Sequence, residues 1–420
     1  MGVARKSKPK TIRRTIRCPL KPLDVQERLL CFWFAACAFV YNWALTRRRE
    51  QYEAWKAGTT TKKGLTAFDQ KAELPALRAL SIALMAIPVV ILRSAIDRLD
   101  KAFDGFFRRV VAGSDPGFPR YRNVSRYDSF SFPWAKGMIV GAGRSARLRI
   151  PMFGMVKINL YRELRGTPKE VTIHRESTGK WWACISCDIG EAPAKLDVAA
   201  IADERKVGID LGLTSIIATS DGEVVDNPRH FQKAKEQLAA RQRRVEKETQ
   251  KGSNGRARVR RLVAKTHKHI ANQRRDFAWK LAKSLVLAND LIALEKLNIA
   301  GLAQGMLGKH VNYVAWRILV HAIMCKAEEA GAWVVEIDPR YTTQECSGCG
   351  NVKPKDLSER IHHCSICGLT LDRDVNAARV VLARAVAALG TSVEKATAAR
   401  SVGKARRSKM DGGDIVATQL

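Results

Sequence analysis

Four cysteines in the C-terminal third of the chain have the spacing of a zinc site. They form two CxxC pairs, each followed by glycine, in CSGCG and CSICG, with fourteen residues between the pairs: Cys346, Cys349, Cys364 and Cys367. A two-residue spacing lets one tight turn present two thiolates to a tetrahedral Zn2+, and glycine permits that turn. A redox dithiol would explain one pair but not both. We therefore predict a structural zinc ribbon.

The other residues of this kind are expected to do no metal chemistry. His362 and His363 adjoin the third cysteine and could compete for the metal, but with four thiolates available we expect both on the surface. Cys184 and Cys187 also read CxxC, yet they lie in an alternating segment, where residues three apart point to opposite faces of a strand. We expect these two to pack, as do the remaining cysteines Cys18, Cys31, Cys37 and Cys325.

Three carboxylates lie in apolar settings. Asp210 is in VGIDLGLTS, Glu295 is in LIALEKLNI, and Asp374 opens DVNAARVVL. An ionised acid inside an apolar strand is costly unless a cation compensates it. Taken singly, each could form a salt bridge, and Asp374 could cap the last helix. One divalent site would explain all three, because acids from separate elements that hold Mg2+ and place a water against a phosphate are the working parts of two-metal nucleases.

The composition favours a globular protein that binds a polyanion. Lysine and arginine number 73 against 41 acids, for a formal charge of +32, and 46% of the 420 residues are hydrophobic, enough for two to three folded domains. Nucleic acid is the commonest partner for such a surplus, with a membrane surface as the alternative. No run approaches the roughly 18 apolar residues that span a bilayer, and the basic start lacks an apolar signal core. We expect a cytoplasmic protein without membrane contact.

The first half of the chain predicts a β module interrupted by helices. Residues 11–19 alternate like a strand, and apolar residues recur at helical spacing over 24–112. From there to about 195, glycine, proline, aromatic residues and alternation predict short strands. Aromatic residues among basic ones in RYRNVSRYDSFSFPW suit either stacking on bases or a strand that packs them inward.

The second half predicts strands alternating with helices. Two apolar runs joined by a turn surround Asp210, and a basic stretch with apolar residues near helical spacing follows to Asn289. A strand (DLIALEKLNIAG), an amphipathic helix around 312–330, a strand (AWVVEIDP), the cysteine region and a last helix (DVNAARVVLARAVAAL) complete it. The remaining tail has no sustained periodicity, and we expect it to be mobile.

The order of these features resembles a known family. An aspartate on a first strand, a glycine turn and second strand, a glutamate ending a later strand and an aspartate opening the last helix match an RNase H-like nuclease core. The chain resembles the RuvC-type nucleases of the TnpB family and their compact type V CRISPR-effector relatives in GIDLGLTSIIATSDG, ALEKLNIAGL, DPRYTTQECSGCG and CSICGLTLDRDVNAAR. The segments GFPRYRNVSRYDSFSF, IPMFGMVKINLYRELRG and GKWWACIS are similar to the β module of that family.

The resemblance implies a multidomain fold of α/β and α+β type. An RNase H-like RuvC core would carry an inserted zinc ribbon, and an N-terminal wedge-like β barrel would carry an inserted helical bundle. The implied segments are a first strand (1–23), the helical bundle (24–115), the rest of the wedge-like module (116–198), the RuvC core (199–341), the ribbon (342–372), the last RuvC helix (373–392) and a disordered basic tail (393–420).

The resemblance also implies an RNA-guided DNA endonuclease. Asp210, Glu295 and Asp374 would hold Mg2+ or Mn2+, with Asp372 only a neighbour of the third ligand. A guide RNA would pair with double-stranded target DNA while the protein reads a short adjacent motif. A monomer with one RNA is the expected state, and the short length favours a transposon-borne nuclease.

Three alternatives compete with this interpretation. A guided binder that cuts weakly or not at all would need to have lost a ligand, and all three acids are present. A DNA-strand-transfer transposase also uses an RNase H-like acidic triad. A zinc-ribbon nucleic-acid-binding protein without chemistry would leave Asp210 and Glu295 unexplained.

Overall fold

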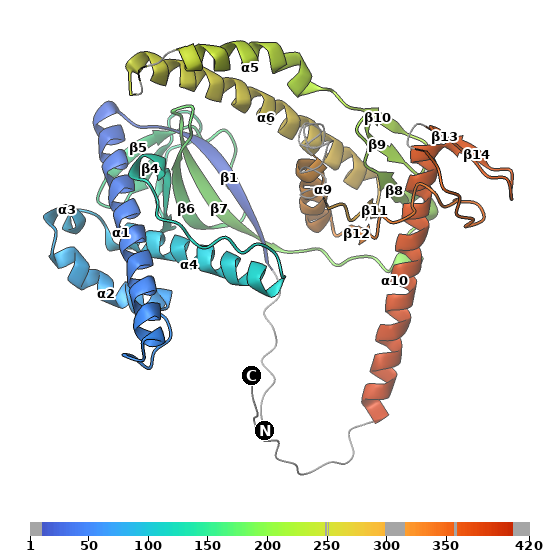
Figure 1. Cartoon of the computed structure of the whole chain (residues 1–420), viewed down its shortest axis with the longest axis horizontal. Coiled ribbons are helices and arrows are strands. Elements are labelled where there is room, and N and C mark those ends of the chain that lie inside the picture. Colours follow the sequence, from blue (N-terminus) through green and yellow to red (C-terminus); the bar gives the residue numbers. More distant parts are fainter. Residues whose placement is uncertain (1–10, 248–249, 251, 299–315, 357–358, 406–420) are drawn as a thin grey trace. The chain divides into compact units, whose positions relative to one another are not determined.

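A computed structural model describes residues 11–247, 250, 252–298, 316–356 and 359–405, with backbone only for 231, 233 and 391–405. The chain divides into two compact units, Met1–Glu191 and Ala192–Leu420. Each unit is built on its own sheet (Figure 1).

The first unit contains a curled antiparallel sheet in the order β2-β6-β7-β1-β5-β4-β3 (Figure 1). Its strands are β1 (Thr11–Lys21), β2 (Ser129–Pro133), β3 (Ile139–Val140), β4 (Arg147–Ile150), β5 (Gly154–Ile158), β6 (Thr167–Arg175) and β7 (Trp181–Glu191). The first strand of the chain, β1, pairs with both β7 and β5, so it lies inside the sheet and not at its edge. The helices that follow β1 are thus inserted between strands of one sheet.

Four helices of the first unit share its core with the sheet. They are α1 (Asp24–Lys56), α2 (Ala67–Ala79), α3 (Ile82–Met85) and α4 (Val89–Val111), and a short 3-10 helix η1 (Val124–Arg126) follows. Phe34 of α1 stacks on Trp181 of β7 at 5.4 Å between ring centroids and contacts Phe130 of β2 at 5.6 Å. Phe130 and Phe132 are buried, so the aromatic residues of SFSFP pack inward and are not available for stacking on bases.

One helix, α1, is long and apolar enough to cross a membrane by length and composition. Our expectation that no segment would meet that measure is wrong for α1, because its residues 29–45 contain no charged side chain. More than half of its apolar window is buried within the protein. The apolar character of α1 therefore serves the core of the first unit.

The second unit contains a mixed sheet in the order β10-β9-β8-β11-β12. Its strands are β8 (Lys206–Asp210), β9 (Ser215–Thr219), β10 (Val224–Asp226), β11 (Leu291–Glu295) and β12 (Trp333–Ile337), preceded by the 3-10 helices η2 (Val198–Ala200) and η3 (Asp203–Arg205). β11 runs parallel to both β8 and β12, and β9 is antiparallel to β8 and to β10. The apolar runs of β8 and β11 follow from their central position, since parallel strands are covered on both faces.

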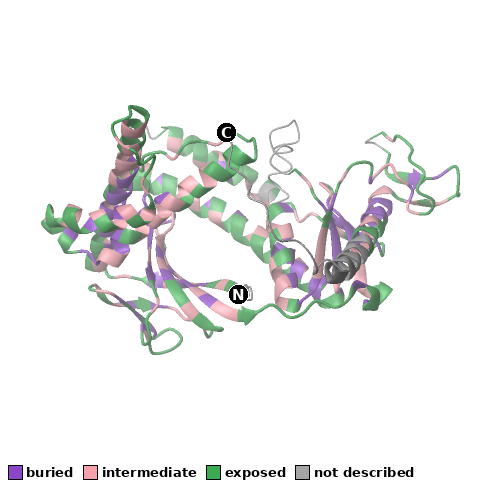
Figure 2. Ribbon diagram, turned by 90° about the horizontal axis from the view of Figure 1, so that it is seen from below, coloured by how far each residue is buried: buried purple, intermediate pink, exposed green. Residues whose placement is uncertain are grey.

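Helices cover both faces of this sheet. They are α6 (Asn254–Ala288) and α9 (Trp316–Ala330) on one face and α10 (Arg373–Ala405) on the other, while α5 (His230–Lys247) packs against α6. Successive side chains of a strand point to opposite faces of the sheet, so alternate residues pack against different helices. Ile209 and Ile292 share a cluster with residues of α6 and α9, whereas Leu291 and Ala293 share one with residues of α10. Figure 2 shows the buried residues gathered on the strands and on the helix faces beside them.

The last helix is longer than its sequence pattern predicts. It runs to Ala405, past residue 392, because VEKATAARSVGKA contains good helix formers and no proline even though it lacks an apolar stripe. The expected mobile tail therefore begins within a helix, and its residues 406–420 lie outside the described residues, as do residues 312–315 of the helix expected around 312–330.

Candidate active site and metal centre

Two neighbouring parallel strands of the second unit end in acids. Asp210 is the last residue of β8 and Glu295 the last of β11, and the final aligned pair of the two strands is Ile209 with Leu294. Each acid directly follows its member of that pair, so the two acids lie next to each other at the same edge of the sheet. By strand alternation both share the face of Ala293, which packs with α10.

The third acid comes from the first turn of α10, which begins beside this edge. Within DRD, the Oδ1 of Asp372 accepts hydrogen bonds from the backbone N–H groups of Asp374 (2.8 Å) and Val375 (3.1 Å). The capping role considered for Asp374 thus belongs to Asp372. The carboxylate of Asp374 instead accepts from the Arg373 guanidinium at 3.2 Å.

The three acids interact electrostatically. Burial, followed by the Glu295 and then the Asp374 carboxylates, raises the pKa of Asp210 to about 8, while Arg373 opposes the shift. Burial also raises the pKa of Glu295, which the Thr342 hydroxyl and Arg384 partly offset. Ionised oxygens held together in a low-dielectric site are the donor set that Mg2+ and Mn2+ prefer. The oxygen donors therefore suit a divalent cation in type, although among the described residues only the four cysteines described below bring all their ligand atoms within 4.8 Å of one another.

A glycine permits the close approach of α10 to β8. A Cβ at Gly208 would lie 2.0 Å from the carbonyl oxygen of Ala378 and 2.8 Å from the Cβ of Leu382, both on α10. Any side chain at this position would push the helix away. Gly208, two residues before Asp210, therefore sets how near α10 lies to the strand that carries the first acid.

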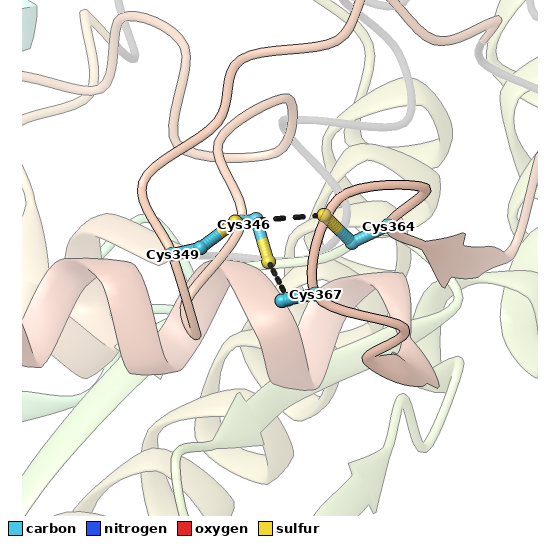
Figure 3. A group of neighbouring side chains, drawn as sticks. All are labelled: Cys346, Cys349, Cys364 and Cys367. Atoms are coloured by element: carbon cyan, nitrogen blue, oxygen red, sulfur yellow. Dashed lines mark hydrogen bonds between the residues drawn. The ribbon is translucent and has the colours of Figure 1, made fainter.

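The four predicted cysteines form one cluster, with all four sulfurs within 4.8 Å of one another. Figure 3 shows the two loops facing each other. The sulfurs of Cys346 and Cys367 lie 3.6 Å apart, and those of Cys349 and Cys364 lie 3.5 Å apart. Tetrahedral Zn2+ with Zn–S bonds of about 2.3 Å would separate the sulfurs by about 3.8 Å. Backbone N–H groups of Cys367 and Ile366 lower the pKa of the Cys364 thiol, while the adjoining thiols raise the pKa of Cys349 in spite of a backbone N–H at Asn351. The cluster fits a structural zinc ion.

One of the two adjacent histidines departs from expectation. His363 is exposed as predicted, but His362 is only 2% exposed, because β13 (Ile361–His363) pairs with β14 (Thr370–Asp372) and alternation turns His362 inward. Its Nδ1 contacts the Nζ of Lys355. Burial, with the nearby Lys355, lowers the pKa of His362. His362 is thus a packing residue beside the cluster and not a surface residue.

Two residues of α10 hold the segment around the first cysteine of the cluster in place. Sequence patterns did not single out either of them. Asn376, fully buried, accepts from the Ser347 N–H (3.0 Å) and donates to the Glu345 carbonyl (2.7 Å). Arg384 donates to the Arg340 carbonyl (2.9 Å) and pairs with the Glu345 carboxylate. One sequence feature could have predicted the role of Asn376: it is a polar residue on the apolar face of a helix that otherwise buries alanine and valine.

Family comparisons cover most of the chain. Residues 194–306 match a family model described as "Probable transposase", residues 316–381 match "Cas12f1-like, TNB domain", and residues 12–57 match "Helix-turn-helix domain". The last of these spans β1 and the single long helix α1, so its described residues hold a strand and one helix and no helix-turn-helix.

Known relatives and a solved structure agree with this assignment. A "Putative RNA-guided DNA endonuclease" of Streptomyces pristinaespiralis is 30% identical over 389 residues, 90% of each chain. The "Putative RNA-guided DNA endonuclease InsQ" of Escherichia coli (strain K12) is 27% identical over 89% of this chain and 93% of its own. The fold is similar to that of Cas12f1 in a complex with sgRNA and target DNA, at a TM-score of 0.56 and 14% identity, with 86% of this chain and 83% of that chain covered. The chain belongs to the TnpB family, among relatives described as RNA-guided DNA endonucleases.

Proposed function

We propose that the protein is an RNA-guided DNA endonuclease that hydrolyses target DNA next to a short recognised motif by two-metal, RuvC-type catalysis. The observation that carries the proposal is the convergence of Asp210, Glu295 and Asp374 from two parallel strands and a helix, close enough for the other two to raise the pKa of Asp210. Buried carboxylates without enough cations to compensate them destabilise a fold, so a bound divalent cation accounts for this group of acids better than a structural role does. The names of the relatives support the same conclusion.

The acids have distinct tasks in this mechanism. Mg2+ or Mn2+, when bound, would activate the attacking water and stabilise the leaving oxygen. Asp210 and Glu295, at the ends of paired strands, hold their oxygens on a rigid edge, and Asp374 approaches from α10 with its backbone fixed by the Asp372 cap. Arg373 balances part of the negative charge.

The rest of the chain would hold nucleic acid. In the proposal, the wedge-like module (1–23 and 116–198) with its helical bundle (24–115) binds the guide RNA, and the RuvC core (199–341 and 373–392) cuts double-stranded target DNA. The ribbon (342–372), folded around zinc, joins the core to α10. The charge of +32 suits a cytoplasmic monomer that holds one RNA and two DNA strands.

The test is to express the protein together with its neighbouring DNA and to sequence the RNA that copurifies. We expect one discrete RNA that ends in variable sequence. That complex should cut DNA matching the variable sequence in Mg2+, whereas an Asp210→Ala complex should bind the same DNA without cutting.

Other outcomes would favour the alternatives. Binding of matched DNA by the wild-type complex without cleavage would favour a guided binder. Joined DNA products would indicate a strand-transfer transposase. If only heterogeneous cellular RNA copurifies, the positive charge serves generic nucleic-acid binding.

A further inference from the structure

We infer that Thr342 is a positioning residue for the divalent site: its hydroxyl orients the Glu295 carboxylate, and the segment leading to the cysteine cluster holds Thr342 in place. The inference rests on the proposed function, because it assigns a task to a residue that touches one of the three acids. Neither sequence pattern nor the family comparisons single out this residue.

The contact between the two side chains is buried. Thr342 is 1% exposed and Glu295 7%, and the Thr342 hydroxyl hydrogen-bonds to Oε1 of Glu295. The same hydroxyl lies 3.0 Å from the Pro339 carbonyl oxygen, but it has one proton to donate. When Glu295 is ionised, that proton is directed to the carboxylate, because charge-assisted hydrogen bonds are the stronger ones. Oε2 of Glu295 then remains for a cation.

The backbone before Thr342 is strained. Tyr341 has φ of 64°, in the left-handed region that non-glycine residues seldom adopt. Its side chain is exposed, so packing of the tyrosine ring does not explain the conformation. Such strain persists only where surrounding contacts determine the backbone. Here it turns the chain so that the next side chain, Thr342, points into the buried site.

Those contacts come from two side chains of α10. Arg384 donates to the carbonyl oxygens of Asp338 (3.3 Å) and Arg340 (2.9 Å), on the N-terminal side of Thr342. Asn376 holds Glu345 and Ser347, which flank the first cluster residue, Cys346. Thr342 is therefore flanked on both sides by segments that α10 holds, and one of these segments enters the first CxxC loop. Hydrogen-bonding partners of metal ligands tune affinity in this way, and their loss commonly costs about 10- to 100-fold.

The experiment measures Mn2+ binding directly, by electron paramagnetic resonance of free Mn2+, on the full chain freed of nucleic acid. Thr342→Val removes the hydroxyl and keeps the shape, and we expect roughly 10- to 100-fold weaker binding. Thr342→Ser keeps the hydroxyl and should bind like wild type. The matched control is Thr343→Val, because among the described residues the Thr343 side chain has no hydrogen-bond partner. In cleavage assays Thr342→Val should need more Mn2+ than wild type to reach its half-maximal rate.

Equal Mn2+ affinity in wild type and folded Thr342→Val would overturn the inference, as would a Thr342→Ser variant as weak as Thr342→Val. Should thermal unfolding show that Thr342→Val is misfolded, Thr342→Ala gives the same comparison. The proposed function itself would be contradicted by a different result: Asp210→Ala leaves Mn2+ binding unchanged from wild type, so that no Mn2+ site depends on the acid.

Discussion

At the scale of single residues, the two aspartates of DRD illustrate how position divides labour. Asp372 accepts two backbone N–H groups at the start of α10, whereas the Asp374 carboxylate accepts from Arg373 and lies near enough to Asp210 to raise the pKa of that acid. Both are one residue from Arg373 and both are acidic, so their types alone do not distinguish them. The difference comes from helix geometry, in which the capping residue precedes the first turn.

This division predicts opposite outcomes for the same substitution. If Asp374 is a metal ligand as proposed, Asp374→Asn should abolish cleavage because it removes a charged donor, while RNA binding stays at the wild-type level. Asp372→Asn should keep cleavage, because asparagine caps a helix as well as aspartate does. Cleavage rates and RNA affinity measured on both variants check this. Normal cleavage by Asp374→Asn would show that the ligand within DRD was wrongly chosen.

The raised pKa of Asp210 predicts how stability depends on pH. The folded state binds the proton of this carboxyl more tightly than the unfolded state, so stability is greatest below the unfolded pKa near 4 and is lost as the pH rises towards about 8. Without added Mg2+ or Mn2+, Asp210→Asn should flatten that decline by an amount on the order of a few kcal/mol. Thermal unfolding of both proteins from pH 5 to 8 measures the difference. Parallel curves would mean that Asp210 is not buried among acids.

At the scale of elements, the site depends on how α10 lies against the sheet. The helix supplies Asp374, packs on β8 at Gly208, and holds the segment before the cysteine cluster through Asn376 and Arg384. One element thus connects the acids, the sheet and the two cysteine loops. Changes that shift α10 should disturb all three.

Gly208→Ala tests the packing of α10. The new methyl group would lie 2.0 Å from the Ala378 carbonyl oxygen, so the helix must move, at a cost of about 1–3 kcal/mol and with loss of cleavage. Gly390→Ala, on α10 with nothing within 4 Å, is the matched control and should be neutral or stabilising by roughly 0.5–1 kcal/mol. Chemical denaturation and cleavage assays report both effects. Equal stability of the two variants would argue against the close contact.

Cys346→Ser tests the cysteine cluster. Loss of one thiolate should lower the zinc content and destabilise residues 342–372, since structural zinc contributes directly to folding. Elemental analysis and hydrogen exchange across that region provide the measurement, with Cys325→Ser, outside the cluster, as the control. A wild-type protein that purifies without zinc and still cuts would contradict the structural role of the metal.

At the scale of the whole molecule, positive charge is expected to dominate the affinity for nucleic acid. A net charge of +32 on 420 residues means that affinity for RNA is set largely by counterion release. If six to ten phosphates are contacted, affinity should fall by about 1,000-fold or more between roughly 50 and 200 mM salt. Filter binding across that range measures the slope. A shallow slope would mean that shape and stacking outweigh charge.

Several features follow from local sequence. The cysteine spacing predicted the four-sulfur cluster, since two tight turns are specified by a few consecutive residues. The apolar runs that end in Asp210 and Glu295 predicted buried strands, and helical periodicity predicted α4 and α6, because each pattern repeats within one element. In α10 the apolar pattern ended early, and helix propensity alone carried the helix to Ala405.

Other features depended on contacts between segments far apart in the chain. The burial of His362, the inward packing of Phe130, the hydrogen bond from Thr342 to Glu295 and the need for Gly208 each depend on which face meets a distant partner. Periodicity gives the faces of one element but not what lies opposite them. The sequence by itself thus determined which residues could do chemistry, and the tertiary structure decided which of them meet, because only packing brings β8, β11 and α10 to one edge of the sheet.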